Sequence, residues 1–264
     1  MAEAAVDLAV TVLGSGTCVP SLERSSCSVL VETAGRKWLM DSGAGTLRRL
    51  LEVGTSHLEL ACILYSHLHP DHTGELVPLL FATKYPDGTT RREPLTVIAG
   101  RGFADFFRRL KNAYGDWIEL GPGRFRIVEM DTDGRDHLHL HGVDLHTMPV
   151  AHTPQSIAFS ITGPAGQRVV YSGDTDVCAG LVELASGADL LICESAFPAA
   201  HKTRGHLTPA EAGALAAKAG VKQLLLTHFY PVCDPAQVEA ECRTTYGGPL
   251  TLARDLMRIV LTAP

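Results

Sequence analysis

A dense run of metal-binding side chains at positions 66–74 constrains this chain more than any other feature. The run reads Ser-His-Leu-His-Pro-Asp-His-Thr-Gly and directly follows the apolar segment Leu60–Tyr65. Three imidazoles and one carboxylate fall within six positions, at His67, His69, Asp71 and His72. Polar groups crowded at the end of a buried strand are costly unless a ligand compensates them. Imidazole together with carboxylate suits zinc, with manganese and iron as alternatives, so the run predicts a metal site.

Four further polar residues stand at the ends of apolar runs that are typical of buried strands. They are Asp41, His152, Asp174 and His228. A single histidine after a strand is most often structural, but five strand ends with suitable residue types are hard to explain in that way. Rigid strands position ligands better than loops do, and a shared edge brings their side chains together. The sequence therefore predicts one site built from five strand ends.

The order of apolar runs predicts an α/β chain in which strands followed by helices occur twice over. We expect two mixed β-sheets packed face to face with helices outside, in one domain that covers residues 1–264. Expected strands are Leu8–Leu13, Ser28–Glu32, Lys37–Met40, Leu60–Tyr65, Leu95–Ala99, Phe125–Met130, Leu138–Met148, Ile157–Thr162, Arg168–Ser172, Leu190–Cys193 and Gln223–Leu226. Expected helices are Thr46–Val53, Glu75–Thr83, Phe103–Ala113 and the segment from Thr208 to Ala217, with a loop at residues 86–90.

Composition narrows the classes of partner. The net charge of −6 argues against a broad nucleic-acid surface, and we interpret Arg91-Arg92 and Arg108-Arg109 with Lys111 as solvated faces. No apolar run approaches the roughly 20 residues that span a bilayer, and residues 1–7 carry acids where a signal peptide would carry lysines. Seven cysteines without a Cys-x-x-Cys pair indicate reduced core thiols. We therefore expect a cytoplasmic protein without a membrane partner.

The metal-binding motifs carry a family resemblance. The order His-x-His-x-Asp-His, then His, then Gly-Asp-Thr, then His resembles the metallo-β-lactamase fold superfamily, whose fold is a four-layer αββα sandwich. Shorter motifs are similar to ribonuclease Z and its phosphodiesterase relatives: Leu13-Gly-Ser-Gly-Thr, Pro20 with Arg24, Asp41-x-Gly-x-Gly, Cys193-Glu-Ser-Ala-Phe and Gly205-His-Leu-Thr-Pro. The resemblance runs from about residue 11 to residue 231.

The resemblance implies two divalent metal ions per chain and a hydroxide between them as the nucleophile. It implies that one ion is held by His67, His69 and His152 and the other by Asp71, His72 and His228. Asp174 is implied to bridge the two ions, and Asp71 is counted also among the catalytic residues. Asp41 is implied to hydrogen-bond a ligand imidazole, which fixes its tautomer. Two such ions lower the pKa of a shared water and stabilise the attacking and leaving oxygens. The absence of a cysteine ligand disfavours the true β-lactamases.

Glu194 and His206 are implied to form a proton-donating pair. A carboxylate beside an imidazole raises the pKa of the imidazole toward or above neutrality, which suits a general acid. The alternative is that Glu194 merely ends a strand and His206 flanks a helix start. Acid catalysis matters most for a poor leaving group such as a sugar hydroxyl, which favours phosphodiesters over lactams.

A group of histidines and a group of phenylalanines are interpreted as structural residues outside the metal site. His137, His139 and His141 alternate with leucines, so we expect them on one exposed face of a strand. Phe103, Phe106 and Phe107 are expected to pack in the core, although they could also form an interface in a homodimer.

The substrate is left open among several hypotheses. His152 and Asp174 are only 22 positions apart (174 − 152), which leaves no room for the arm with which ribonuclease Z grips transfer RNA. The first hypothesis is therefore a hydrolase of small phosphodiesters or nucleotide-like esters, with RNA possible but not favoured. The alternatives are ribonuclease Z activity without the usual arm, and hydrolysis of a sulfate ester, lactone or thioester. A non-catalytic binding or sensing module predicts missing ligands, and none is missing.

Overall fold

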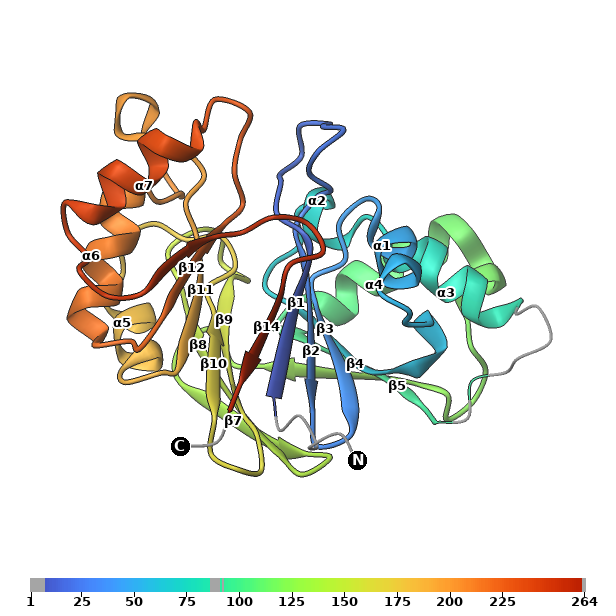
Figure 1. Cartoon of the computed structure of the whole chain (residues 1–264). Helices are drawn as coiled ribbons and strands as arrows, with labels where there is room; N and C mark the ends of the chain where they lie inside the picture. Colours follow the sequence, from blue (N-terminus) through green and yellow to red (C-terminus); the bar gives the residue numbers. More distant parts are fainter. Residues whose placement is uncertain (1–7, 86–90, 92, 263–264) are drawn as a thin grey trace, which may run out of the picture.

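Two β-sheets of seven strands each form the centre of the protein, and helices cover their outer faces (Figure 1). The structure is a computed structural model, and it describes residues 8–85, 91 and 93–262. The strand order is β14-β1-β2-β3-β4-β5-β6 in the first sheet and β13-β12-β11-β10-β9-β8-β7 in the second. This arrangement confirms the expected α/β sandwich.

The first sheet mixes antiparallel and parallel strands. Its members are β1 (Leu8–Gly14), β2 (Ser28–Thr33), β3 (Arg36–Met40), β4 (Leu60–Tyr65), β5 (Leu95–Gly100), β6 (Phe125–Met130) and β14 (Arg258–Leu261). β3, β4, β5 and β6 run parallel, so their carboxyl ends meet at one edge. β14 returns from the far end of the chain to pair antiparallel with β1.

The second sheet is also mixed, and its parallel part lies nearest the carboxyl terminus. Its members are β7 (Asp136–Leu140), β8 (Val143–Pro149), β9 (Ile157–Thr162), β10 (Arg168–Tyr171), β11 (Leu190–Glu194), β12 (Leu224–Thr227) and β13 (Leu250–Leu252). β10, β11, β12 and β13 are parallel neighbours. Their carboxyl ends therefore form a second edge where polar side chains can gather.

Helices cover each sheet on the side away from the other sheet (Figure 1). The first sheet is covered by α1 (Thr46–Glu52), α3 (Leu76–Lys84) and α4 (Phe103–Tyr114), and the second by α5 (Ala179–Ala185), α6 (Pro209–Ala219) and α7 (Pro235–Arg243). Short elements are α2 (Pro70–Thr73), η1 (His57–Glu59), η2 (Gly115–Ile118) and η3 (Ala199–His201). α6 begins at Thr208, whose side chain forms the expected capping box with Glu211.

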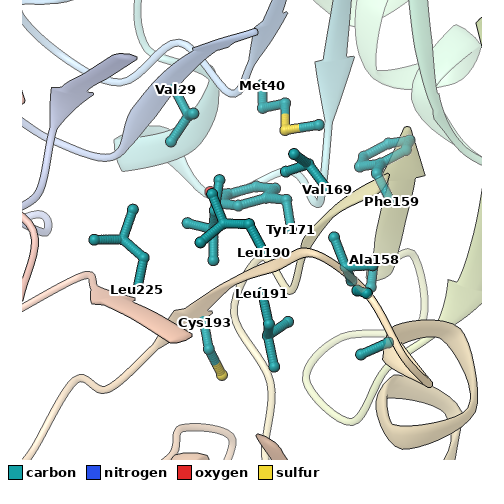
Figure 2. Close-up of a cluster of buried hydrophobic side chains, with 14 of the residues drawn as sticks. Val29, Met40, Ala158, Phe159, Val169, Tyr171, Leu190, Leu191, Cys193 and Leu225 are labelled. Atoms are coloured by element: carbon teal, nitrogen blue, oxygen red, sulfur yellow. The ribbon is translucent and has the colours of Figure 1, made fainter. Parts of the chain in front are cut away.

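The core follows from the alternation of side chains along the strands. In β3, Trp38 and Met40 belong to the cluster that extends between the sheets, whereas Leu39 packs with the helices outside. Every residue of β4 is buried, as expected for a parallel strand covered on both faces. Figure 2 shows Met40 and Val29 of the first sheet with Phe159, Val169 and Tyr171 of the second. This packing fixes the distance between the two edges that carry the site.

The structure corrects three sequence predictions. The strand expected at Leu138–Met148 is a hairpin, because the chain turns at His141 (φ 52°) and Gly142 (φ 75°). His141 is exposed like His137 and His139, but it lies in this turn and not on their strand face, and its ring contacts Trp38. Arg91 is 5% exposed rather than solvated, since its guanidinium donates to the carbonyls of Leu58, Leu60 and Pro94.

Other expectations agree with the structure where it describes the chain. Arg108 and Arg109 are exposed and pair with Asp105, as on a solvated helix face. Phe103 and Phe107 are buried, whereas Phe106 is only partly buried. The amino-terminal residues 1–7, the loop at residues 86–90 and Arg92 lie outside the described residues. Within the described part, no helix is long and apolar enough to cross a membrane.

Candidate metal centre and proton-donor pair

The parallel strands bring the predicted site residues together from distant parts of the chain. Asp41 follows β3 and His67 follows the neighbouring β4. Asp174 lies beyond the end of β10, Glu194 ends β11 and His228 follows β12. Adjacent parallel strands share a carboxyl edge within each sheet, and His72 links the two edges by contacting both Asp41 and His228, which are 187 positions apart (228 − 41). Each sheet supplies part of one site.

One group of potential ligands consists of His67, His69, His152 and Asp174. Their ligand atoms lie within 4.8 Å of one another. His69 Nδ1 is 3.0 Å from His67 Nε2 and 3.2 Å from His152 Nε2. Nitrogens that share a tetrahedral ion at about 2.0–2.1 Å lie roughly 3.3 Å apart, so this spacing suits one metal ion.

A second group of potential ligands consists of Asp71, His72 and His228, with Asp174 beside them. His72 Nε2 is 3.3 Å from His228 Nε2 and 3.3 Å from Asp174 Oδ1. Asp71 Oδ2 lies 3.6 Å from His228 Nε2. Asp174 thus contacts both groups, with Oδ2 on the side of His67 and Oδ1 on the side of His72. The seven predicted ligands all come together.

The hydrogen bonds around the cluster show that these residues fit a cation. His152 Nδ1 donates to the carbonyl of Gly205 at 2.8 Å, so its Nε2 lone pair is aimed at the cluster. Asp41 accepts from His72 Nδ1 at 2.7 Å, with the same consequence for His72. Asp174 Oδ1 is buried without a hydrogen-bond partner. Converging lone pairs and an unpaired buried carboxylate oxygen are what a bound metal ion would compensate.

The electrostatics of the cluster agree with this interpretation. Burial lowers the pKa of His67 well below the usual value and also lowers the pKa of His152, which favours the neutral imidazole that binds metals. Burial also opposes charge on His72, but Asp174 and Asp41 outweigh it and raise the pKa of His72 well above its usual value. The buried carboxylates therefore stabilise positive charge within the cluster.

Asp41 accepts several hydrogen bonds that orient the potential ligands from the first sheet. It is fully buried and holds a positive φ of 55°, which is uncommon for a residue other than glycine. Its carboxylate accepts from the backbone N–H and hydroxyl of Ser66, both at 2.8 Å, from Tyr171 at 2.7 Å and from His72. The Ser66 hydroxyl also lies 3.0 Å from His67 Nδ1. Asp41 is thus connected to a potential ligand of each group, and its bond to His72 is a contact with a predicted ligand imidazole, although the prediction did not say which one.

Replacing Asp41 by asparagine is expected to weaken metal binding by about 10- to 100-fold, the usual effect of losing such an orienting partner. The amide offers one acceptor oxygen in place of the carboxylate that Ser66, Tyr171 and His72 share. Competition with a chromophoric chelator measures the affinity. Asp255→Asn is the control, because Asp255 also accepts from Ser15 and Ser25 but contacts no proposed ligand. Equal affinity in Asp41→Asn and wild-type protein would contradict the orienting role.

The predicted proton-donating pair is present beside the cluster. His206 Nδ1 lies 3.0 Å from Glu194 Oε1, and 3.9 Å from Asp174 Oδ2. Glu194 is 1% exposed, and its oxygens also accept from the backbone N–H groups of Thr175 and Ala196. Burial raises the pKa of Glu194 and opposes charge on His206, but Glu194 and then Asp174 raise the pKa of His206 overall. A protonated His206 near neutral pH can act as an acid.

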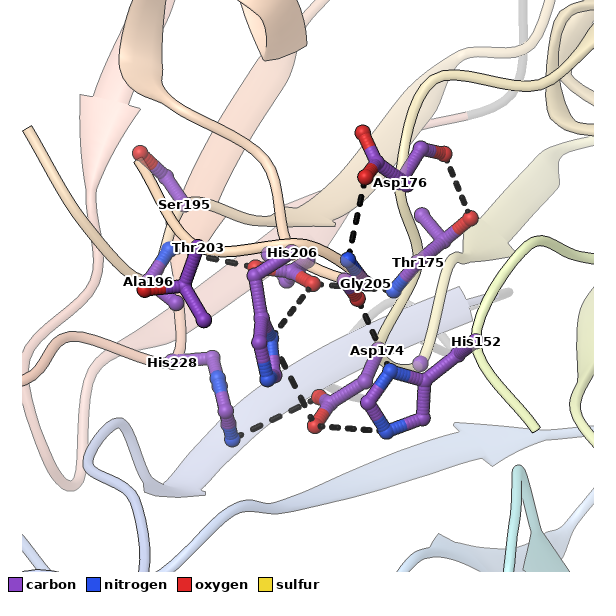
Figure 3. A network of polar contacts seen from close by, with 12 residues as sticks. His152, Asp174, Thr175, Asp176, Ser195, Ala196, Thr203, Gly205, His206 and His228 are labelled. Atoms are coloured by element: carbon purple, nitrogen blue, oxygen red, sulfur yellow. Dashed lines mark hydrogen bonds and ion pairs between the residues drawn. The ribbon is translucent and has the colours of Figure 1, made fainter. Parts of the chain in front are cut away.

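Ion pairs of Lys202 hold the loop that carries His206 in place. Lys202 Nζ donates to Asp176 and to Glu211, each at 2.7 Å. Asp176 in turn accepts from the N–H of Gly205 at 3.0 Å, as Figure 3 shows. Gly205 has a φ of +89°, and a Cβ there would lie 3.0 Å from His152 Nδ1. One loop therefore positions the proton donor and one predicted ligand together.

Sequence reasoning missed Ser66, Tyr171, Asp176 and Gly205 as supporting residues. Ser66, Asp176 and Gly205 stand within two positions of a predicted site residue, so adjacency was the available signal. Tyr171 could not be found in this way, because its hydroxyl reaches Asp41 across the space between the sheets. The histidines of β7 make contacts of their own with β8: His139 pairs with Asp144, and His137 stacks on His146.

Two packed mixed sheets carry a His/Asp cluster at their carboxyl edges, and the family and the relatives that match this chain support a metal-dependent hydrolase. A family model described as "Beta-lactamase superfamily domain" matches residues 36–229. The chain belongs to this superfamily, and its fold is the metallo-β-lactamase fold.

Known relatives and solved structures agree with the family assignment. Ribonuclease Z of Mycobacterium avium (strain 104) is 32% identical over 282 residues, which cover 97% of this chain and 99% of the relative. The crystal structure of the short form of human tRNase Z superposes with a TM-score of 0.76 and 27% identity, covering 97% of this chain and 99% of the human one. The metallo-β-lactamase fold protein YhfI of Bacillus subtilis reaches a TM-score of 0.82 at 23% identity, covering 96% and 98% of the two chains.

Proposed function

We propose that this protein is a phosphodiesterase that uses two divalent metal ions and a proton donor to hydrolyse a small phosphodiester or a nucleotide-like ester. The observation that carries the proposal is the Glu194–His206 pair, 3.0 Å apart, directly beside the His/Asp cluster. A donor at this position is useful when the leaving group is a poor one, because an alkoxide must be protonated as it departs. Sugar hydroxyls in phosphodiesters are leaving groups of this kind.

The proposed ligands divide as the two structural groups do. His67, His69 and His152 would hold one ion, Asp71, His72 and His228 the other, and Asp174 would contact both. Zinc fits this donor set, and manganese or iron(II) are alternatives. When bound, such ions supply an activated water and neutralise the charge of the phosphoryl oxygens. Asp41 orients His72 directly and His67 through Ser66.

The remaining steps belong to the side chains of the second sheet. His206 would protonate the departing oxygen, and Glu194 would hold the imidazole in place and favour its charged form. The Lys202–Asp176 ion pair would keep the loop with His206 against the cluster. These contacts hold His206 and Glu194 beside the cluster, an arrangement that suits charge developing at the leaving group.

The test is the hydrolysis of bis(p-nitrophenyl) phosphate by protein loaded with zinc or manganese. We expect turnover that a chelator removes and that added metal restores, because the proposed metal ions supply the activated water. The chelated protein is the control. Hydrolysis of a sulfate ester, lactone or thioester by metal-loaded protein that leaves every phosphodiester intact would contradict the proposal.

A second candidate function is ribonuclease Z activity, which the similarity to ribonuclease Z of Mycobacterium avium and to human tRNase Z favours. Between His152 and Asp174 this chain has only β9, β10 and one short turn, so an RNA would have to be held elsewhere. Cleavage of a precursor transfer RNA at its 3′ end, compared with bis(p-nitrophenyl) phosphate, separates the two candidates. We also propose a cytoplasmic location, which the seven free cysteines support.

A further inference from the structure

Two stacked aromatic rings flank the proton donor on the rim of the site. Phe197, three residues after Glu194, and Tyr230, two residues after His228, have ring centroids 4.2 Å apart at an interplanar angle of 23°. Both rings contact His206 edge-on, with centroid distances of 5.9 Å for Phe197 and 6.4 Å for Tyr230. Tyr230 also contacts His228. The pair thus borders the proton donor and one end of the His/Asp cluster.

Neither ring is part of the buried core. Phe197 and Tyr230 are both partly exposed, although their neighbours Ala196 and Phe229 are buried. Tyr230 also borders a hollow of about 210 Å³ whose other lining residues include Gly16, Arg24 and Phe229. The hydroxyl of Tyr230 is 3.5 Å from the thiol of the exposed Cys18, which is a weak partner. A stacked aromatic pair with open space beside it has no evident structural task at this place.

The position of the pair determines which part of a substrate can reach it. A proton donor must come within about 2.6–3.2 Å of the oxygen that it protonates, so the leaving group has to lie next to His206. Besides the imidazoles of His152 and His228, the rings found in contact with His206 in the described part of the chain are Phe197 and Tyr230. A leaving group attached to that oxygen therefore extends along these rings. A planar heterocycle would extend the stack, whereas a bare sugar or alkyl group would not.

We propose that Phe197 and Tyr230 form a subsite for the nucleobase of the leaving nucleoside, so that the substrates are nucleotide phosphodiesters. This inference rests on the proposed function, because it takes His206 as the group that faces the leaving oxygen. The Tyr230 hydroxyl is the one polar group that the two side chains carry, and it lies 3.5 Å from the Cys18 thiol, so the subsite recognises a flat ring rather than a particular base. Stacking of this kind tolerates all bases, since each has a π-face.

The experiment compares two ligands that differ only in the base. Adenosine 5′-monophosphate and ribose 5-phosphate are titrated into metal-loaded protein by calorimetry and used as competitive inhibitors of bis(p-nitrophenyl) phosphate hydrolysis. We expect the nucleotide to bind about 5- to 150-fold more tightly, the factor that one stacked base contributes. Tyr230→Leu and Phe197→Leu should each bring this ratio toward one, whereas Tyr230→Phe should preserve it because the ring remains.

Tyr114→Leu is the matched control, because Tyr114 is a partly exposed aromatic residue at the end of α4 that contacts none of the proposed site residues. Metal content and the thermal midpoint establish that each variant is folded. A ratio near one in the wild-type protein, or a ratio that both leucine variants leave unchanged, would overturn the subsite. The calorimetric ratio does not depend on turnover, so loss of the subsite and failure of the phosphodiesterase proposal give different results.

Discussion

Replacing Asp174 by alanine is expected to lower the metal content from about two ions per chain and to reduce turnover of bis(p-nitrophenyl) phosphate to background, as a two-metal reaction requires. The reason is geometric. Asp174 Oδ1 and Oδ2 face different imidazoles, at 3.3 Å from His72 Nε2 and 3.7 Å from His67 Nε2. Removing this carboxylate takes a ligand from both groups at once, whereas removing any one histidine takes a ligand from one.

Elemental analysis of dialysed protein gives the metal content, and the release of p-nitrophenolate gives the turnover. Asp189→Ala is a suitable control, because Asp189 is a carboxylate directly before β11 of the same sheet that pairs with Lys222 and lies outside the cluster. The control should retain both metal and activity. If Asp174→Ala kept the metal content and the activity of the wild-type protein, Asp174 would not be a shared ligand.

The second large effect is expected from His206→Ala, and it should depend on the leaving group. If general acid catalysis is lost, poor leaving groups such as alkoxides should react about two to four orders of magnitude more slowly. p-Nitrophenolate departs without a proton, so its release should change far less. The rates for bis(p-nitrophenyl) phosphate and for a dialkyl phosphodiester, in which both possible leaving groups are alkoxides, give the comparison.

His201→Ala controls for the loss of a histidine from the same loop, because His201 is exposed and carries none of the contacts of His206. Glu194→Gln should reproduce part of the His206 effect, since the carboxylate sustains the raised pKa of that imidazole. An equal loss for all leaving groups in His206→Ala would indicate a role in binding or folding instead of proton donation.

The site could be predicted because its residues follow a local rule. Asp41, His67, His152, Asp174 and His228 each follow an apolar strand, and the structure brings these strand ends to one place. The family resemblance supplied the pairing of ligands, which spacing alone could not. The Asp41–His72 contact and the Glu194–His206 contact are present at 2.7 Å and 3.0 Å.

What the sequence could not predict depends on contacts between distant segments. The burial of Arg91 follows from carbonyls of Leu58 and Leu60, more than 30 positions earlier, and no local pattern marks an arginine as buried. β14 pairs with β1 across the whole chain, with Leu261 opposite Leu8. The hairpin at His141 was missed for a local reason, because a continuous alternation of apolar residues concealed a turn at Gly142.

The division of the ligands between the two sheets has a consequence for how this protein can change over evolutionary time. His67, His69, Asp71 and His72 come from the first sheet, while His152, Asp174 and His228 come from the second. Each proposed ion would therefore link the two sheets at the edge where their loops meet. A substitution at one of these positions would remove a ligand that catalysis needs and would also weaken a link between the two sheets. Selection would therefore act against it for both reasons.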